Sequence, residues 1–253
     1  MTAQSFALRT ENLRKRFGSL EVARDVSINL PRGARHALIG PNGAGKTSLV
    51  NLITGQLAPD SGRVLLDGND ITRLNRAARV KAGLARTFQI NQLFPALTPI
   101  EAITLAVTER KGTAGQFWRS LASHDDAIDE AWDILVQLRL SDVATRPTRV
   151  LAYGQQRLLE IGLALATRPK VLLLDEPAAG VPKGESAELF SVIAALPDDI
   201  SVLFIEHDMS LVFKFAARII VLVAGGVLLE AEPDVIRTDQ RVRDVYLGQA
   251  HHG

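Results

Sequence analysis

A glycine-rich segment, GPNGAGKT at residues 40–47, constrains the fold more than any other part of the chain. A short apolar run precedes it, and the residues after it recur at helical spacing up to Gly55: Leu49, Leu52 and Ile53. This pattern predicts a buried strand, a tight loop and a helix. In such a loop the backbone N–H groups point inward around a polyphosphate. We therefore expect an α/β fold with a phosphate site at the start of that helix.

The residue types inside the loop support the same interpretation. The segment fits G-x-x-x-x-G-K-[ST], in which Lys46 reaches the terminal phosphates and the Thr47 hydroxyl can ligate Mg²⁺. The alternative is a tight turn that needs glycine only for its geometry, and we discount it because the required strand and helix both flank the loop. The predicted nucleotide-binding residues here are Gly40, Pro41, Asn42, Gly43, Ala44, Gly45, Lys46, Thr47 and Ser48.

Two continuous apolar runs, residues 169–177 and 200–208, end in acidic or polar side chains. Such runs are typical of parallel strands covered on both faces, and alternating strands and helices predict a mostly parallel sheet. The apolar stretch 219–229 contains Gly225-Gly226 and predicts two strands around a turn. Between about 90 and 165 the strand signal is absent, which predicts a helical insertion.

Two patterns define helices in that insertion. Thr98-Pro99-Ile100-Glu101 is a capping box with proline at the first helical position. The segment DDAIDEAWDILVQLRL, at residues 125–140, predicts a second helix, and we expect one buried face formed by Ile128, Trp132, Leu135 and Val136.

Polar side chains at the strand ends are the candidate catalytic and metal-binding groups. Asp175 can hold Mg²⁺ through water, and Glu176 can orient an attacking water. An acidic pair that only caps the next segment is the alternative. Because strand ends of a parallel sheet converge, we expect Thr47, Asp175 and His207 to meet in one crevice. A surface or capping position is predicted for the other histidines, His36, His124, His251 and His252.

Composition excludes several classes of function. Lysine plus arginine (29) nearly equals aspartate plus glutamate (28), so we expect no nucleic-acid partner. The chain has no cysteine, which excludes disulfides, thiolate catalysis and a cysteine zinc site. The amino terminus lacks the apolar core of a signal peptide, and the stretch 219–229 is too short to span a membrane.

Taken in order, these motifs resemble those of ATP-binding cassette (ABC) proteins. The segment LAYGQ, at residues 151–155, resembles the family signature LSGGQ and is followed by a helix with apolar residues at helical spacing. RTFQ at 86–89 resembles the Q-loop, and LLLDE precedes IEHDM in the family's order. The resemblance implies a P-loop NTPase (RecA-like) core with a mostly parallel sheet, an N-terminal antiparallel β region and an inserted α-helical subdomain. The expected division is one domain over 1–253, with the core at about 1–89 and 166–253 and the helical subdomain at about 90–165.

The resemblance also implies roles for particular residues. It assigns ATP and Mg²⁺ as cofactors, Glu176 and His207 as catalytic, Phe17 to stacking on adenine, and Gln89 to the metal together with Thr47 and Asp175. In the family two cassettes pack head to tail, and the signature residues serve the ATP held by the partner. Those residues correspond here to Ala152, Tyr153, Gly154 and Gln155.

The finer pattern looks like the longer ATPase subunit of importers for branched-chain amino acids and related solutes. That resemblance implies a second ABC ATPase subunit, two transmembrane permease subunits, an indirect periplasmic solute-binding protein, and a place on the cytoplasmic face of the inner membrane. A soluble non-transport ABC ATPase and a nucleotide-binding regulatory cassette with weak hydrolysis are the alternatives. Two departures bear on the last: Ala152 replaces the signature serine, and Pro182-Lys183 stand where the D-loop has asparagine and proline.

Overall fold

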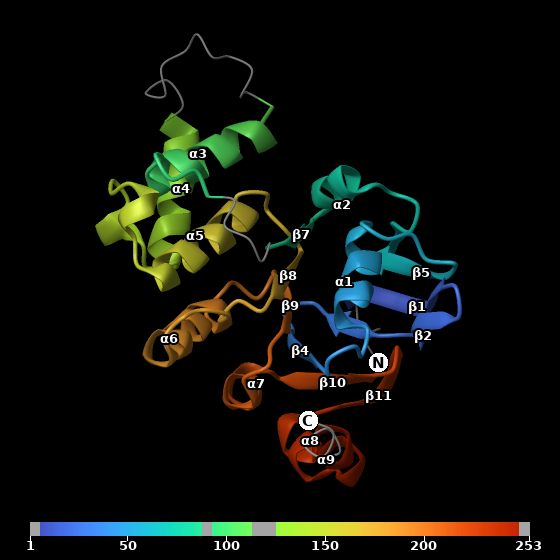
Figure 1. Ribbon diagram of the computed structural model, residues 1–253. Coiled ribbons are helices and arrows are strands. Elements are labelled where there is room, and N and C mark those ends of the chain that lie inside the picture. The colour runs from blue at the N-terminus through green and yellow to red at the C-terminus, as the bar shows by residue number, and fades with distance from the viewer. Residues whose placement is uncertain (1–5, 88–92, 113–124, 248–253) are drawn as a thin grey trace, which may run out of the picture.

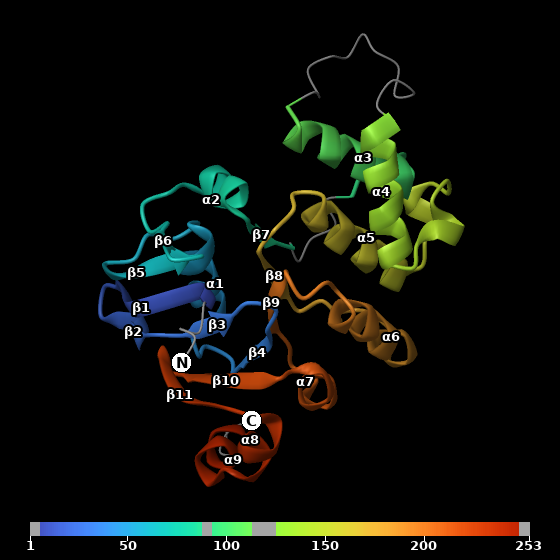
Figure 2. The same ribbon diagram turned by 180° about the vertical axis from the view of Figure 1, so that it is seen from behind.

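The computed structural model describes residues 6–87, 93–112 and 125–247, whose strands form two sheets (Figures 1 and 2). The N-terminal sheet is antiparallel, with order β2-β1-β5-β6 and β3 paired with β1. Its strands are β1 (Phe6–Phe17), β2 (Leu20–Val26), β3 (Asn29–Pro31), β5 (Ser61–Leu66) and β6 (Asn69–Asp70). The expected antiparallel β region is therefore confirmed.

The second sheet has the order β11-β10-β4-β9-β8-β7, and every neighbouring pair is parallel except β10 and β11. Its strands are β4 (Arg35–Ile39), β7 (Leu84–Arg86), β8 (Val171–Asp175), β9 (Ser201–Ile205), β10 (Arg218–Val223) and β11 (Gly226–Ala231). Because β9 lies between β4 and β8, the segments that follow these three strands are neighbours. The predicted mostly parallel sheet is confirmed.

Helices pack around the second sheet, and the stretch of chain that connects its neighbouring strands β7 and β8 is helical (Figure 1). They are α1 (Lys46–Thr54), α2 (Arg76–Ala82), α3 (Pro99–Arg110), α4 (Asp125–Gln137), α5 (Tyr153–Leu165), α6 (Lys183–Ala194), α7 (Met209–Phe215), α8 (Pro233–Thr238) and α9 (Gln240–Leu247), with short 3₁₀ turns η2 (Ser141–Val143) and η3 (Thr148–Val150). The predicted capping box begins α3: the Glu101 carboxylate accepts the Thr98 N–H at 2.8 Å. None of the helices in the described part of the chain has the length and hydropathy that crossing a bilayer requires.

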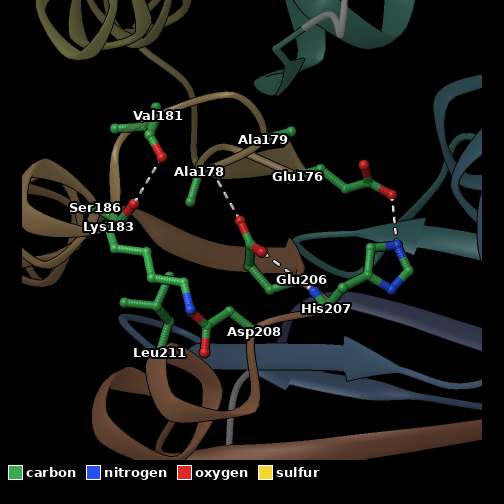
Figure 3. A pocket seen from close by; sticks show the side chains of 10 residues that line it. All are labelled: Glu176, Ala178, Ala179, Val181, Lys183, Ser186, Glu206, His207, Asp208 and Leu211. Atoms are coloured by element: carbon green, nitrogen blue, oxygen red, sulfur yellow. Dashed lines mark hydrogen bonds and ion pairs between the residues drawn. The ribbon is translucent and has the colours of Figure 1, made fainter.

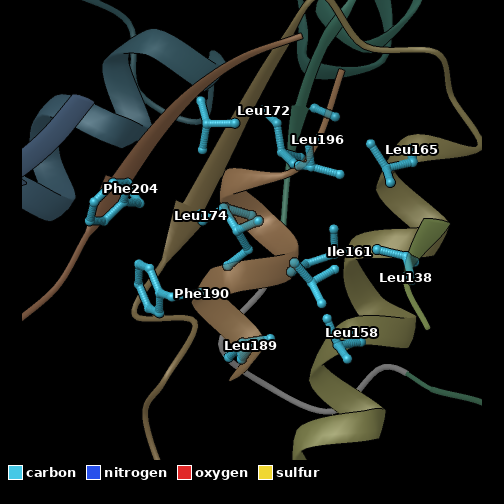
Figure 4. Packing of buried hydrophobic residues seen from close by; sticks show 14 of the residues in the cluster. Leu138, Leu158, Ile161, Leu165, Leu172, Leu174, Leu189, Phe190, Leu196 and Phe204 are labelled. Carbon is cyan, nitrogen blue, oxygen red and sulfur yellow. The ribbon is translucent and has the colours of Figure 1, made fainter. Parts of the chain in front are cut away.

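The buried strands contribute side chains to two apolar clusters, one on each face of the second sheet. Strand β8 places Leu172 and Leu174 in one cluster and Leu173 in the other, so alternate residues of one continuous apolar run are buried on opposite faces. Figure 4 shows the first cluster between the strands, α6 and α5, where Leu158 and Ile161 of α5 take part. Full burial of each such side chain contributes about 1.5–3 kcal/mol.

The predicted buried face of α4 is wrong in part. Leu135 is buried as expected, but Trp132 and Val136 are 46% and 52% exposed, and the helix instead buries Ala127, Ala131 and Ile134. Two apolar stripes overlap on this helix, one residue apart in register. The stripe with alanines is buried because small side chains let α4 approach the neighbouring helices closely.

The turn between β10 and β11 is as expected, with Gly225 in the left-handed region at φ +79°. The prediction for His36 is wrong. It lies on the central strand β4 and is only 2% exposed, and burial together with the nearby charge of Arg218 lowers its pKa to about 4. A polar residue in a central strand is buried by its place in the sheet. The remaining histidines of that group, His124, His251 and His252, lie outside the described residues.

Candidate functional site

The glycine loop ends where α1 begins, and backbone geometry shapes it. Gly45 is the N-cap of α1, has φ +100° and offers no side chain to the first N–H groups of the helix. A Cβ on Gly45 would lie 2.5 Å from the Val22 carbonyl oxygen, and one on Gly40 would overlap the Leu222 carbonyl oxygen. The loop therefore needs glycine at both positions, and the start of α1 keeps its N–H groups available to an anion.

Lys46 occupies the first position of α1 and is 8% exposed. Its Nζ donates to the carbonyl oxygens of Gly40 at 2.7 Å and Pro41 at 3.0 Å. Burial lowers its pKa, and the charges of Glu176 and Asp175 act in the opposite direction. These hydrogen bonds hold the Lys46 ammonium group across the loop, where it can contact an anion bound inside the loop.

A cavity of about 330 Å³ opens at this loop. It is lined by residues of the loop and α1, by two residues of β2, and by two side chains that follow β8 and β9: Leu20, Val22, Asn42, Gly43, Ala44, Gly45, Lys46, Thr47, Ser48, Glu176 and His207. The structure thus brings Thr47, Glu176 and His207 together from three separate segments. Asp175 is not among the lining residues.

Glu176 and His207 face each other across the ends of β8 and β9 (Figure 3). The Nε2 of His207 lies 2.7 Å from Oε1 of Glu176, and their side chains are 50% and 26% exposed. Glu176 has φ +49°, a left-handed conformation that costs about 1 kcal/mol or more for a residue with a side chain. Its N–H donates to the Ile205 carbonyl oxygen at 3.0 Å, which fixes this strained residue to β9.

Asp175, the last residue of β8, forms a partly buried ion pair with Arg86. Nη2 of Arg86 lies 2.5 Å from Oδ2 of Asp175, and the two side chains are 11% and 7% exposed. Arg86 ends β7, and its Nη1 also donates to Oδ1 of Asn51 on α1 at 2.8 Å. Arg86 belongs to the RTFQ segment, and no role for it was predicted from the sequence. A basic residue at the end of the neighbouring strand was the available signal.

No role was predicted from the sequence for Glu206 either, which directly precedes His207. Its side chain is 6% exposed, and its carboxylate accepts the N–H groups of Ala178 at 2.9 Å and His207 at 3.2 Å (Figure 3). An acidic residue at the end of a buried strand was the signal here, as it was for Asp175.

The start of α5 lies apart from this cavity. Its N-cap is Ala152, which has no side-chain acceptor, and Oε1 of Gln155 accepts the Ala152 N–H at 3.1 Å. Tyr153 Oη accepts from Arg157 at 2.7 Å, and its ring lies beside Gly180. In the described part of the chain the cavity takes none of its lining from α5, so Ala152, Tyr153, Gly154 and Gln155 are not brought to Lys46.

Two further candidate residues have separate outcomes. Phe17 ends β1, is 53% exposed and does not line the cavity, although Leu20 and Val22 of the following strand β2 do. Lys15 places its Nζ 5.6 Å from the centre of the Phe17 ring. Gln89 lies outside the described residues.

Together these groups can bind and hydrolyse a phosphoanhydride. The loop and Lys46 offer donors and positive charge to a polyphosphate, and Thr47 offers a hydroxyl at the same cavity. The Glu176 carboxylate can orient water. The His207 imidazole, whose Nε2 lies 2.7 Å from Oε1 of Glu176, can donate a hydrogen bond to developing negative charge.

Comparisons with known proteins agree with this arrangement. Residues 23–179 match the ABC transporter family. The chain is 38% identical over 250 residues to BraF of Pseudomonas aeruginosa, a high-affinity branched-chain amino acid transport ATP-binding protein, covering 96% of this chain and 98% of BraF. The high-affinity branched-chain amino acid transport ATP-binding protein LivG of Escherichia coli (strain K12) is also 38% identical, with the same coverage.

A solved structure shows the same fold. The crystal structure of the ADP conformation of an ATP-binding cassette from an ABC transporter superposes with a TM-score of 0.84 at 33% identity, covering 97% of this chain and 100% of that one. The nucleotide-free form of an ATP-binding cassette from an ABC transporter gives a TM-score of 0.82. The chain therefore belongs to the ABC transporter family, with the nucleotide-binding P-loop NTPase fold and the ATP-hydrolysing activity of its ATPase cassettes.

Proposed function

We propose that this chain is the ATP-binding and ATP-hydrolysing subunit of an importer for branched-chain amino acids or a related small solute. The observation that carries the proposal is the match to BraF and LivG over 96% of the chain. The cavity supports it, because the phosphate loop, Glu176 and His207 line one space.

In this proposal each residue acts on ATP through the atoms that face the cavity. Lys46 and the N–H groups at the start of α1 bind the phosphates, and Ser48 and the other loop residues enclose them. Glu176 holds the attacking water in line with the terminal phosphorus. His207 stabilises the charge that develops on the transferred phosphoryl group. Phe17, exposed at the end of β1, stacks on adenine.

The donor atoms at the site fit Mg²⁺ bound together with a nucleotide. No cluster of three or more acidic or histidine side chains that could hold a metal exists among the described residues. Thr47 and Asp175 offer hard oxygen atoms, and Mg²⁺ is usually held by one or two carboxylates plus substrate phosphates. Thr47, with Asp175 and Gln89 through water, would hold the ion. When bound, Mg²⁺ neutralises charge on the phosphate oxygens.

We further propose that a second ABC cassette completes the site. The start of α5 leaves N–H groups without a side-chain cap, which suits the terminal phosphate of an ATP bound by that partner. Ala152 offers no hydroxyl there, and such a hydrogen bond to a charged acceptor is worth about 1.5–3 kcal/mol. With Pro182-Lys183 in the D-loop, this makes the composite site that receives α5 the slower of two in a heterodimer.

The rest of the assembly is proposed from the same resemblance. Two permease subunits hold this chain at the cytoplasmic face of the inner membrane, and a periplasmic protein delivers the solute. The helical subdomain, at about 90–165 within the single domain 1–253, contacts the permeases. The core at about 1–89 and 166–253 carries the nucleotide.

Phosphate release from ATP tests the catalytic assignment. Glu176→Gln should lower turnover about 100-fold or more while nucleotide affinity stays within a few-fold, because it removes the water-orienting carboxylate and leaves the loop intact. Lys46→Ala should weaken binding of a fluorescent ATP analogue about 10-fold or more, since a charged partner of the phosphates is lost. Turnover by Glu176→Gln at the native rate would refute the assignment.

Uptake of labelled leucine tests the transport assignment. Cells in which this gene is deleted should lose high-affinity uptake and regain it with the native chain but not with Lys46→Ala. Uptake that is unaffected by the deletion, with phosphate release intact, would leave an ATPase and rule out this solute class.

A further inference from the structure

Glu206 connects two loops that carry the catalytic side chains. Its Oε1 accepts the Ala178 N–H at 2.9 Å, in the turn after β8, and its Oε2 accepts the His207 N–H at 3.2 Å, in the segment after β9. Figure 3 shows Glu206 between the two loops, with its carboxylate directed to both. One side chain therefore accepts two backbone N–H groups from segments about 30 residues apart.

The environment of this carboxylate argues against a purely space-filling role. Glu206 is 6% exposed, and none of the ion pairs formed by the described residues includes it. Burial and the charge of Glu176 raise its pKa, and the backbone donors oppose that shift. Burying a carboxylate costs free energy unless hydrogen bonds compensate for the lost water. Those hydrogen bonds are available only while both loops stay in place.

Two other contacts join the loops, and both involve Glu176. Its N–H donates to the Ile205 carbonyl oxygen at 3.0 Å, and its side chain meets that of His207 at 2.7 Å, where both side chains are partly exposed. Glu176 is strained at φ +49°. Without Glu206, the Ala178 and His207 N–H groups would lose their acceptor, and the segment carrying His207 could move independently of the turn carrying Glu176.

We propose that Glu206 is a positioning residue for ATP hydrolysis, joining the turn at Ala178 to the segment of His207 so that Glu176 and His207 face the same phosphate. The inference rests on the proposed roles of those two side chains.

The test replaces the carboxylate by an amide of equal size. Glu206→Gln in the full-length chain puts an NH₂ group against a backbone N–H, so one of the two links is broken. Turnover of ATP should fall at least 10-fold, with KM for ATP within 2-fold of native. Glu188→Gln, on the exposed side of α6, is the matched control and should keep native turnover. Turnover of Glu206→Gln within 2-fold of native would overturn the proposal.

A double-variant cycle separates positioning from general loss of structure. If Glu206 acts through His207, then Glu206→Gln should lower turnover less than 2-fold in the His207→Ala background. Independent, multiplying losses would overturn the proposal. The ring Cε1–H resonance of His207 in NMR spectra should also shift in Glu206→Gln, and an unchanged resonance would count equally against it. If Glu206→Gln does not fold, Glu206→Asp, whose shorter side chain cannot reach both loops, takes its place in every measurement.

The cycle also distinguishes this inference from the proposed function. Should Glu176→Gln and Lys46→Ala retain native turnover, the catalytic assignment fails whatever Glu206 does. Should those two variants lose turnover while Glu206→Gln retains it, the assignment stands and only the positioning role is refuted.

Discussion

The helices α1 and α5 begin in similar ways, but the first residue of α1 is charged and the first residues of α5 are neutral. Each lacks a side-chain cap on its first N–H groups, since Gly45 and Ala152 have no side-chain oxygen. At α1 the first residue is the buried cation Lys46, with Glu176 and Asp175 near enough to affect its pKa. At α5 the first three residues, Tyr153, Gly154 and Gln155, are neutral.

This difference shows which interactions stabilise the chain at the start of each helix. Around α1 the chain has enclosed its own charges, so the region depends on pairs that must stay matched. The first three residues of α5 carry no charge. Tyr153 contacts Gly180, and its hydroxyl accepts from Arg157, whose ion pair with Glu160 lies one turn further along the helix. Removing a group at α1 should therefore cost much more stability than changing one at α5, and four variants measure the gap.

The largest effect is expected from Arg86→Ala. It leaves Asp175, 7% exposed at the side chain, without the guanidinium 2.5 Å away, and loss of one member of a buried pair costs about 3–5 kcal/mol. The free energy of unfolding measured in urea should fall by about 3 kcal/mol. Arg63→Ala, which breaks an ion pair to Glu11 from a side chain 62% exposed, is the control and should cost about 1 kcal/mol or less. Equal losses for the two variants would break the comparison.

A smaller effect of opposite sign is expected from Ala152→Ser. The new hydroxyl can accept an N–H from the first turn of α5, and a serine N-cap is worth about 1 kcal/mol over alanine. The free energy of unfolding in urea should rise by about 0.5–1 kcal/mol. Ala195→Ser at the exposed C-cap of α6 is the control and should give no gain. No gain from Ala152→Ser would contradict the prediction and would mean that the first-turn N–H groups of α5 gain nothing from a side-chain acceptor.

Local patterns were sufficient to predict much of the fold and the α1 side of the site. The continuous apolar runs predicted β8 and β9 as buried strands of a parallel sheet, because consecutive residues such as Leu172 and Leu173 are buried on opposite faces. The phosphate loop could be predicted because all its residues, from Gly40 to Thr47, are contiguous in the sequence.

What could not be predicted depends on residues distant in sequence. Arg86 and Asp175 are 89 positions apart, and no local pattern pairs them. Ala131 rather than Trp132 faces the core because neighbouring helices approach closely, which periodicity alone does not reveal. His36 is buried by its central position in the sheet, a property of strand order.

The smallest effects come from two glycines at the same helical position, Gly154 in α5 and Gly184 in α6. Each is the second residue of its helix. A Cβ on Gly184 meets nothing within 4 Å, so Gly184→Ala should raise the free energy of unfolding by about 0.5 kcal/mol. A Cβ on Gly154 would lie 2.9 Å from Oε2 of Glu185, an exposed carboxylate that can move aside, so Gly154→Ala should change stability by about 0.5 kcal/mol or less.

The pair then tests why glycine stands at the start of α5. If α5 receives the phosphate of a partner's ATP, a methyl group at Gly154 obstructs that approach, although the isolated chain tolerates it. ATP-dependent association of cassettes in the Glu176→Gln background, followed by light scattering, should weaken for Gly154→Ala and not for Gly184→Ala. Equal association by both variants would show that the neutral helix start serves the fold alone, and the contrast with α1 would lose its functional meaning.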